Sequence, residues 1–217
     1  MDKVISETKR WVEQQLTAEK TGHDWYHIDR VYKMAIRLAK EEGADPFIVA
    51  MAALLHDLAD DKVVKDEQAG LDRIEAWLDR FHVSKSDRLH ILTIITSISY
   101  KGGNGEKLKT IEAKVVQDAD RLDALGAIGV ARTFQYSGAK GQPIYEPQRE
   151  VRSKMTLEEY RHGQSSAVHH FYEKLLKLKD LMNTKTGKKI AEERHQFIEV
   201  FLEQFLLEWG SPQRGDS

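Results

Sequence analysis

Apolar residues recur along this chain at intervals of three and four positions, which is the spacing of one face of an α-helix. Apolar–polar alternation of the kind found in strands is scarce, and the 217 residues include only 4 prolines. The pattern predicts roughly seven or eight helices, over residues 4–16, 27–42, 46–56, 67–81, 84–100, 112–135, 156–181 and 186–209. We therefore expect an all-α fold in which the last two helices pack as a C-terminal hairpin.

Several boundaries of these helices carry residues of the expected types. Asp45 and Pro46 are a capping side chain followed by a first-turn proline, which predicts a helix start. Gly43 suits the left-handed residue that ends the preceding helix. Small residues in the range 112–135 would let a neighbouring helix approach closely. Residues 137–154 hold 2 prolines and 2 glycines, so we expect a loop there.

Composition narrows the class of protein. Lys and Arg number 33 against 35 Asp and Glu, which gives a formal net charge of −2. Because positive and negative charges are nearly balanced, the chain has no net positive charge to attract nucleic acid or an anionic membrane. We therefore expect neither as a partner. The chain has no cysteine, which excludes disulfides, thiolate metal ligands and cysteine nucleophiles. The charged N-terminal stretch MDKVISETKRW lacks the apolar core of a signal peptide, so we expect a soluble cytoplasmic protein.

The helix expected over residues 46–56 ends in an unusual way. Its apolar run, Ile48 to Leu55, leads directly into His56 and Asp57. Further ionisable side chains follow within one turn, namely Asp60, Asp61 and Lys62. An apolar run of this length predicts a buried element. Ionisable groups at its end are costly unless something satisfies them, and a bound metal ion would do so.

Other sequence motifs of catalysis are absent. The chain contains no phosphate-binding loop, no dinucleotide-binding glycine motif, no HExxH and no GxSxG. What remains is a set of imidazoles and carboxylates on predicted helices, namely His27, His56, Asp57, Asp118, Asp120 and Asp123. Imidazole nitrogens and carboxylate oxygens suit a divalent metal such as Mn, Fe, Co, Ni or Zn, or alternatively Mg. Two histidines with two aspartates would leave positions open for a water molecule and a substrate oxygen.

Each of these side chains also has an ordinary structural explanation. A lone histidine at a helix start, such as His27, is most often a capping or exposed residue. Three nearby aspartates usually mark a solvated helical face. The pair of His56 and Asp57 is harder to explain in that way, because burying both without a partner is costly. The residues alone therefore favour a metal site without deciding all of its ligands.

Several segments, in a fixed order, carry a resemblance to a known family. HxxRV begins at His27, LLHDL surrounds His56, and ADRLDA surrounds Asp120, while SYKGG and KKIAEERHQFIEVFLEQF extend the match over almost the whole chain. Together they resemble the HD-domain superfamily of metal-dependent phosphohydrolases and, within it, the small bacterial YpgQ/YedJ-like group. The resemblance implies an HD-type helical bundle forming one domain over residues 1–217. Its metal-site core would span about 20–136 and its C-terminal helices about 155–210.

The resemblance makes four residues the metal ligands, namely His27, His56, Asp57 and Asp120. The last of them has an alternative, because Asp118 stands close by and, at ~100° per residue, points well away from Asp120 on a helix. Asp120 follows a small residue, as in the family pattern, so we take it as the ligand and keep Asp118 as the alternative. Asp123 shares a helical face with Asp120 and is a candidate to support the ligands.

The resemblance implies a single divalent ion, because His82 and His90, which lie between the HD pair and Asp120, do not match the ligand pattern of the extra histidines in binuclear members. The ion would be Mn, Mg, Co, Ni or Fe. Asp57 or Asp60 would help to remove a proton, whereas Asp61 is equally well explained as solvated. The groups that could bind a phosphorylated substrate are His23, Lys62, Lys101 and Arg132. Arg132 is favoured among them because it lies in an otherwise small and apolar helix.

The implied function is metal-dependent hydrolysis of a phosphoester or phosphoanhydride bond in a nucleotide. Within the group, the favoured reaction converts (deoxy)nucleoside triphosphates to the monophosphate and pyrophosphate. A phosphomonoesterase or a cyclic-nucleotide phosphodiesterase is an alternative enzyme. In a different class, the chain could be a non-catalytic module that holds a metal and senses a nucleotide. The expected partner is a small phosphorylated substrate, and the sequence leaves a homodimer open.

Overall fold

The computed structural model describes residues 1–17, 22, 24–59, 66–98, 108–152, 163 and 165–210. Within these ranges every regular element is an α-helix or a 3-10 helix, which confirms the all-α prediction. No described helix is both long enough and apolar enough to cross a membrane. The chain divides into two compact units, Met1–Asp120 with Asn183–Gly187, and Arg121–Met182 with Lys188–Ser217. A single domain over residues 1–217 stays a prediction.

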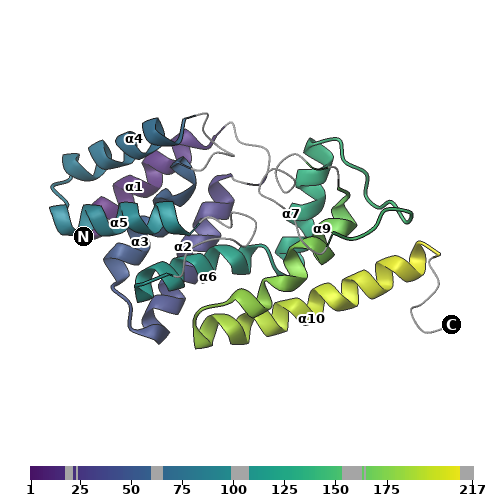
Figure 1. Ribbon diagram of the computed structural model, residues 1–217. Helices are drawn as coiled ribbons and strands as arrows, with labels where there is room; N and C mark the ends of the chain where they lie inside the picture. Colours follow the sequence, from purple (N-terminus) through teal and green to yellow (C-terminus); the bar gives the residue numbers. More distant parts are fainter. Residues whose placement is uncertain are drawn as a thin grey trace. The chain divides into compact units, whose positions relative to one another are not determined.

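The first unit is arranged around one buried helix. Its elements are α1 (Asp2–Gln15), α2 (Trp25–Glu42), α3 (Pro46–Leu55), the 3-10 helix η1 (His56–Ala59), α4 (Glu67–Arg80), α5 (Lys85–Ser97) and most of α6 (Ile111–Asp123). Every residue of α3 from Ile48 to Leu55 is buried. In Figure 1 this helix lies among α1, α2 and α5, and it contacts all three. The apolar run of the sequence is therefore the core of this unit.

The predicted capping residues determine where α2 ends and α3 begins. Asp45 accepts hydrogen bonds from the backbone N–H groups of Phe47 and Ile48, and Pro46 occupies the first turn of α3. Gly43 follows α2 with a φ of 71°, in the left-handed region where a side chain would be strained. The short turn between these signals brings α3 back against α2, and the two helices pack together.

A close backbone contact supports the turn after α3. A Cβ atom at Gly70 of α4 would lie 2.8 Å from the Cα atom of Ala59 and 2.8 Å from the carbonyl oxygen of Leu58. Any larger residue would have to displace α4 or η1. Glycine at this position therefore lets α4 pack directly on the turn that carries His56 and Asp57.

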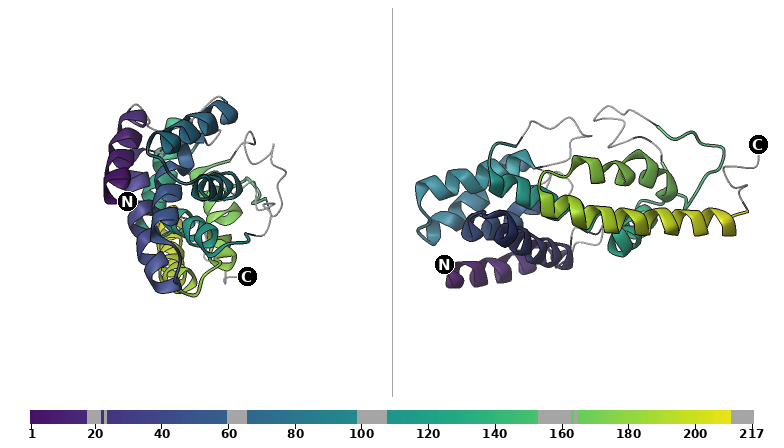
Figure 2. Two further views of the ribbon diagram at one scale, coloured as in Figure 1. Left: turned by 90° about the vertical axis from the view of Figure 1, so that its left-hand side faces the viewer. Right: turned by 90° about the horizontal axis from the view of Figure 1, so that it is seen from below.

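The second unit is built around aromatic side chains. Its elements are the end of α6, α7 (Gly126–Ala139), α9 (Ala167–Glu173), the 3-10 helices η3 (Leu175–Lys177) and η4 (Lys179–Leu181), and most of α10 (Lys185–Glu208). Phe134 of α7 and Phe171 of α9 each lie with their ring centroid 5.9 Å from that of Phe201 of α10. Figures 1 and 2 show α9 beside α10, which confirms the predicted hairpin.

One predicted helix is interrupted. The sequence predicts a single helix over residues 112–135, whereas the structure has α6 and α7 with a break between them. Gly126 adopts a φ of 70°, which is left-handed. A Cβ atom at Gly129 would lie only 2.2 Å from the carbonyl oxygen of Ala124. The prediction of a single helix was wrong. The sequence analysis interpreted these glycines as a surface for helix packing, whereas in the structure they allow the chain to change direction.

The helix predicted over residues 156–181 is also shorter than expected. Its predicted start lies outside the described residues. The described part begins at Ser166, whose hydroxyl accepts a hydrogen bond from the backbone N–H of His169, and α9 then ends at Glu173. Two 3-10 turns, η3 and η4, follow in place of a continuous helix. No proline or glycine occurs between positions 167 and 182 to signal the change.

Candidate metal centre

His27 is placed by the first turn of α2. The helix begins at Trp25, two residues earlier than the sequence pattern predicts. Asp24 caps it, and its carboxylate accepts a hydrogen bond of 2.9 Å from the backbone N–H of His27. The imidazole is completely buried. The cap thus fixes the start of α2 with the His27 side chain inside the first unit.

His56 and Asp57 lie where α3 changes into η1. Nδ1 of His56 is 2.9 Å from the carbonyl oxygen of Ala53. A carbonyl oxygen can only accept, so Nδ1 carries the proton and the ring presents Nε2 to its other neighbours. Nε2 of His56 is 3.2 Å from Oδ1 of Asp57, and Nε2 of His27 is 3.4 Å from Oδ2 of Asp57.

Asp120 reaches the same place from α6. Its Oδ1 lies 3.5 Å from Nε2 of His27 and 3.8 Å from Nε2 of His56. The Asp120 side chain is 38% exposed, whereas Asp57 and the two histidines are buried. The structure therefore brings the four predicted ligands together, and Asp120 is the one at which the cluster meets solvent.

These spacings fit a divalent metal ion. His27, His56 and Asp57 each offer one ligand atom within 4.8 Å of the others. With metal–ligand bonds of ~2.1 Å, donor atoms lie ~3.0 Å apart at a right angle and ~3.4 Å apart at a tetrahedral angle. The nitrogen–oxygen separations in the cluster run from 3.2 to 3.8 Å. The donor set fits as well, because two carboxylates in a largely buried place need positive charge beside them.

Asp118, the alternative ligand, faces a different part of the first unit. Its carboxylate is completely buried. It accepts hydrogen bonds of 2.8–3.1 Å from the backbone N–H and side-chain amide of Asn183 and from the N–H and hydroxyl of Thr184. Both of its oxygens are engaged by these donors, whereas Asp120 faces the two imidazoles. The geometry favours Asp120 as the fourth ligand.

The remaining predicted site residues divide into two groups. Those outside the described residues are His23, Asp60, Asp61, Lys62 and Lys101. Arg132 is described, and it donates a hydrogen bond of 2.9 Å to Oδ2 of the buried Asp123. Both residues belong to the second unit. The contact of Arg132 with substrate and the support that Asp123 would give the ligands stay predictions.

Two features beside the cluster escaped the sequence analysis. Gly70 is one of them, because it lets α4 pack against η1. The other is the segment Asn183–Gly187, which binds Asp118 two residues before Asp120. Each had a weak signal in the sequence. An isolated glycine interrupts an amphipathic helical pattern, and Thr184 precedes a helix in a capping position.

A second buried carboxylate belongs to the other unit. Glu173 of α9 accepts two hydrogen bonds of 2.7 Å from the guanidinium group of Arg152 and one of 3.0 Å from the Ser165 hydroxyl. Burial alone would raise the pKa of Glu173, but these hydrogen bonds outweigh it and hold the pKa below its ordinary value of 4.5. This ion pair ties the segment after α7 to α9.

Comparisons with known proteins bear on the family of the chain. Residues 24–125, which include all four clustered residues, match the HD domain. Over 204 residues the chain is 40% identical to the uncharacterized protein YpgQ of Bacillus subtilis strain 168, covering 93% of this chain and 92% of that protein. The crystal structure of YpgQ in complex with ADP has a TM-score of 0.76 at 38% identity, covering 94% of this chain and 97% of that chain.

Two further crystal structures are similar over nearly their whole length. A protein from Lactobacillus plantarum has a TM-score of 0.87 at 39% identity, covering 97% of this chain and 98% of that chain. An HD-superfamily hydrolase from Bacillus thuringiensis has a TM-score of 0.77 at 47% identity, covering 97% of this chain and 99% of that chain. The chain therefore belongs to the HD-domain superfamily of metal-dependent phosphohydrolases, and within it is similar to YpgQ.

Proposed function

We propose that this protein is a nucleotide pyrophosphohydrolase that converts (deoxy)nucleoside triphosphates to the monophosphate and pyrophosphate, using one divalent metal ion. The observation that carries the proposal is the convergence of four ligand atoms, from His27, His56, Asp57 and Asp120. Support for a nucleotide comes from YpgQ, whose crystal structure contains ADP. ADP shares with a nucleoside triphosphate the nucleoside and the anhydride bond between the α- and β-phosphates.

The chain supplies the ion with two imidazole nitrogens and two carboxylates. When bound, a divalent ion supplies Lewis acidity that polarises a phosphoryl oxygen and lowers the pKa of a neighbouring water molecule. The hydrogen bond from Nδ1 of His56 to Ala53 holds that ring in the tautomer and orientation needed for Nε2 to bind metal. Mixed nitrogen and oxygen donors favour Mn²⁺, Fe²⁺, Co²⁺ or Ni²⁺, and Mg²⁺ is the remaining candidate.

The proposed reaction consumes one water molecule. The water oxygen bonds to the α-phosphorus, and the anhydride bond between the α- and β-phosphates breaks. The two products are a nucleoside monophosphate and pyrophosphate. A proton leaves the water, and we assign its removal to Asp57 or Asp60. Cationic side chains would offset charge on the departing pyrophosphate, and the candidates are His23, Lys62, Lys101 and Arg132. Asp123 would hold the guanidinium group of Arg132 in place through their 2.9 Å contact.

The reaction can be tested by incubating the protein with Mn²⁺, Mg²⁺, Co²⁺ or Ni²⁺ and a panel of nucleotides. The panel contains nucleoside mono-, di- and triphosphates and cyclic nucleotides, and the released anion is identified by ion chromatography. We expect pyrophosphate and a monophosphate from triphosphates. His56→Ala should be inactive, and Glu203→Gln, which changes an exposed carboxylate of α10, should retain full activity.

The other outcomes identify the alternatives. Release of orthophosphate from monophosphates would indicate a phosphomonoesterase, and opening of cyclic nucleotides would indicate a phosphodiesterase. Tight nucleotide binding without turnover under any of the four metals would favour a sensing module. Any of these three results would replace pyrophosphohydrolysis as the function of this site.

A further inference from the structure

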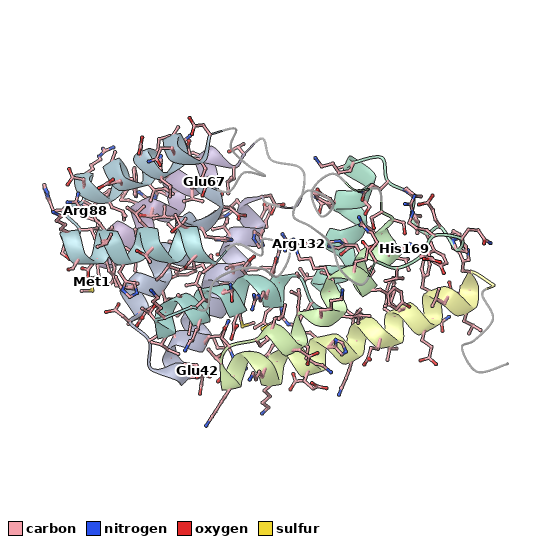
Figure 3. All side chains as sticks on the ribbon, in the orientation of Figure 1. Met1, Glu42, Glu67, Arg88, Arg132 and His169 are labelled. Atoms are coloured by element: carbon pink, nitrogen blue, oxygen red, sulfur yellow. The ribbon has the colours of Figure 1, made fainter. Side chains whose placement is uncertain are left out.

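The segment Asn183–Gly187, where α10 begins, is part of the first unit. It donates hydrogen bonds to carboxylates on two different helices, Asp118 of α6 and Glu42 of α2. Figure 3 shows Glu42 at the end of α2, beside the start of α10. Since α2 also carries His27 and α6 carries Asp120, this segment joins two helices that contribute side chains to the candidate metal centre.

Asp118 is the main anchor of the segment. Its Oδ1 accepts hydrogen bonds from the backbone N–H of Asn183 at 2.9 Å and from the side-chain amide of Asn183 at 2.8 Å. Its Oδ2 accepts from the backbone N–H and from the hydroxyl of Thr184, both at 2.8 Å. The Asp118 carboxylate is completely buried and accepts from the two residues through backbone and side-chain donors. It is firmly held, because any shift would leave these buried polar groups without a hydrogen bond.

The rest of the segment has little room to adjust. Oγ1 of Thr184 accepts a hydrogen bond of 3.0 Å from the backbone N–H of Gly187, which caps α10. A Cβ atom at Gly187 would lie 2.5 Å from Oδ2 of Asp118. The backbone N–H of Thr186 donates to Oε1 of Glu42 at 2.8 Å. The end of α2 is thus linked to α6 by a chain of short contacts.

Asp118 and Asp120 point to different sides of α6. Two residues along a helix turn through ~200°, so one carboxylate faces the start of α10 while the other faces the two imidazoles. Oδ1 of Asp120 must stay within reach of Nε2 of His27, from which it is now 3.5 Å away. A short side chain at the exposed side of the cluster takes its position largely from the helix that carries it. The rotation of α6 therefore decides whether Asp120 can act as a ligand.

We propose that Asp118 is a positioning residue for the metal centre. By binding the start of α10 it fixes the rotation and height of α6, and it thereby holds Asp120 in reach of the two imidazoles. This inference rests on the proposed metal site and deepens it, since it explains why a buried carboxylate that binds no metal stands two residues from one that does.

The affinity of the full chain for Mn²⁺, measured by isothermal titration calorimetry, tests the positioning role. Thr184→Val removes a hydroxyl that donates to Asp118 and caps α10, and it touches no ligand. We expect the dissociation constant for Mn²⁺ to rise by about 10- to 100-fold, the range found when residues that orient metal ligands are replaced. Thr184→Ser keeps the hydroxyl and should bind Mn²⁺ as the wild type does. Asp118→Asn removes the anchor itself and should weaken binding at least as much as Thr184→Val.

Thr8→Val is the matched control for a loss of stability. Thr8 is buried in α1, and its hydroxyl accepts a hydrogen bond of 2.9 Å from Nε1 of Trp77 in α4. The substitution thus removes one buried hydroxyl contact within the same unit, between two other helices. We expect a fall in melting temperature like that of Thr184→Val but an unchanged dissociation constant for Mn²⁺. A purely structural role of Thr184 would give the two variants equal affinities.

The outcomes separate the positioning role from the metal site itself. If Thr184→Val and Asp118→Asn, each shown to be helical by circular dichroism, bind Mn²⁺ as tightly as the wild type, the positioning role is wrong and the metal site stands. If the wild type binds no Mn²⁺, the proposed metal site is wrong and the inference falls with it. Should Asp118→Asn fail to fold, the comparison of Thr184→Val with Thr184→Ser and Thr8→Val decides the question.

Discussion

Nε2 of His56 lies 3.2 Å from Oδ1 of Asp57, its immediate neighbour in the chain. Neighbouring side chains on a regular α-helix diverge by ~100°, so such a pair does not ordinarily converge. Here the α-helix α3 ends at Leu55 and the tighter 3-10 helix η1 begins at His56. Because the helix type changes at the end of this buried helix, Nε2 of His56 and Oδ1 of Asp57, both candidate ligand atoms, lie close together.

Replacing His56 or Asp57 by alanine should abolish metal binding while the helices persist. Each change removes one donor from a cluster in which the described residues offer two imidazoles and two carboxylates. Plasma mass spectrometry of the purified variants should show a metal content near zero, against about one ion per chain for the wild type. Far-UV circular dichroism should be unchanged, because neither side chain forms part of the apolar core of α3.

A matched control is Asp72→Ala, which removes an exposed carboxylate that accepts a hydrogen bond from Gln68 on α4. It should retain both metal and stability. Metal at ~100 times its dissociation constant should stabilise the wild type and this control by ~2.7 kcal/mol, and His56→Ala not at all. Unchanged metal content in both alanine variants would show that the cluster is not the binding site.

Asp118 and Asp120 should respond differently to replacement by asparagine. In metal-free protein, Asp118→Asn should lower the free energy of unfolding by about 2–4 kcal/mol, because an amide nitrogen would face buried donors. Asp120→Asn should change it by less than about 0.5 kcal/mol, since this side chain is 38% exposed. Urea titrations of the two variants measure the difference.

Metal content distinguishes the two aspartates further. Asp120→Asn should lose the ion although it remains stable, and Asp118→Asn should still bind it, only more weakly. The opposite pattern, with full metal content in Asp120→Asn and none in a folded Asp118→Asn, would make Asp118 the ligand.

Gly70→Ala should destabilise the protein by about 1–3 kcal/mol, the usual cost of forcing a methyl group into a packed site. The new Cβ atom would lie 2.8 Å from backbone atoms of Leu58 and Ala59, so η1 or α4 must move. Gly138→Ala is the matched control, since nothing lies within 4 Å of its Cβ position in α7. Removing a glycine from a helix there should stabilise by about 0.5–1 kcal/mol. Equal thermal shifts for the two variants would contradict the close packing of Gly70.

Features determined by neighbouring residues could be predicted from the sequence. The uninterrupted apolar run from Ile48 to Leu55 predicts a buried helix, and Asp45 with Pro46 predicts its start, because both effects act within a turn or two. The ordered histidines and aspartates likewise predicted which side chains would converge. For these side chains the prediction that they lie together came from the resemblance to the family. The spacing of the residues alone left Asp118 and Asp120 as alternatives.

Features determined by distant residues could not be predicted. A Cβ atom at Gly126, where the helix breaks, would lie 3.1 Å from the side chain of Arg194 in α10, which is far away in the sequence. A glycine in the sequence does not show whether it permits a close helix contact or a turn. Asp118 is the clearest case. Its donors, Asn183 and Thr184, lie more than 60 positions away in the chain, so no local pattern could show that its carboxylate is already engaged.

Glu173 should make the stability of the protein depend on pH in the acid range. Its pKa is lower in the folded chain than its ordinary value of 4.5, because hydrogen bonds from Arg152 and Ser165 favour the ionised form despite burial. The ionised carboxylate therefore stabilises the fold above pH 4.5, and this stabilisation is lost as the pH falls through the lower folded-state pKa. Glu173→Gln should be less stable than the wild type near neutral pH, and the difference should narrow as the pH falls below 4.5. Urea unfolding across this range measures the difference.

Glu203→Gln, which changes an exposed carboxylate on α10, is the control and should follow the wild type across this pH range. If the stability of Glu173→Gln instead runs parallel to that of the wild type throughout, the result would contradict the ion pair.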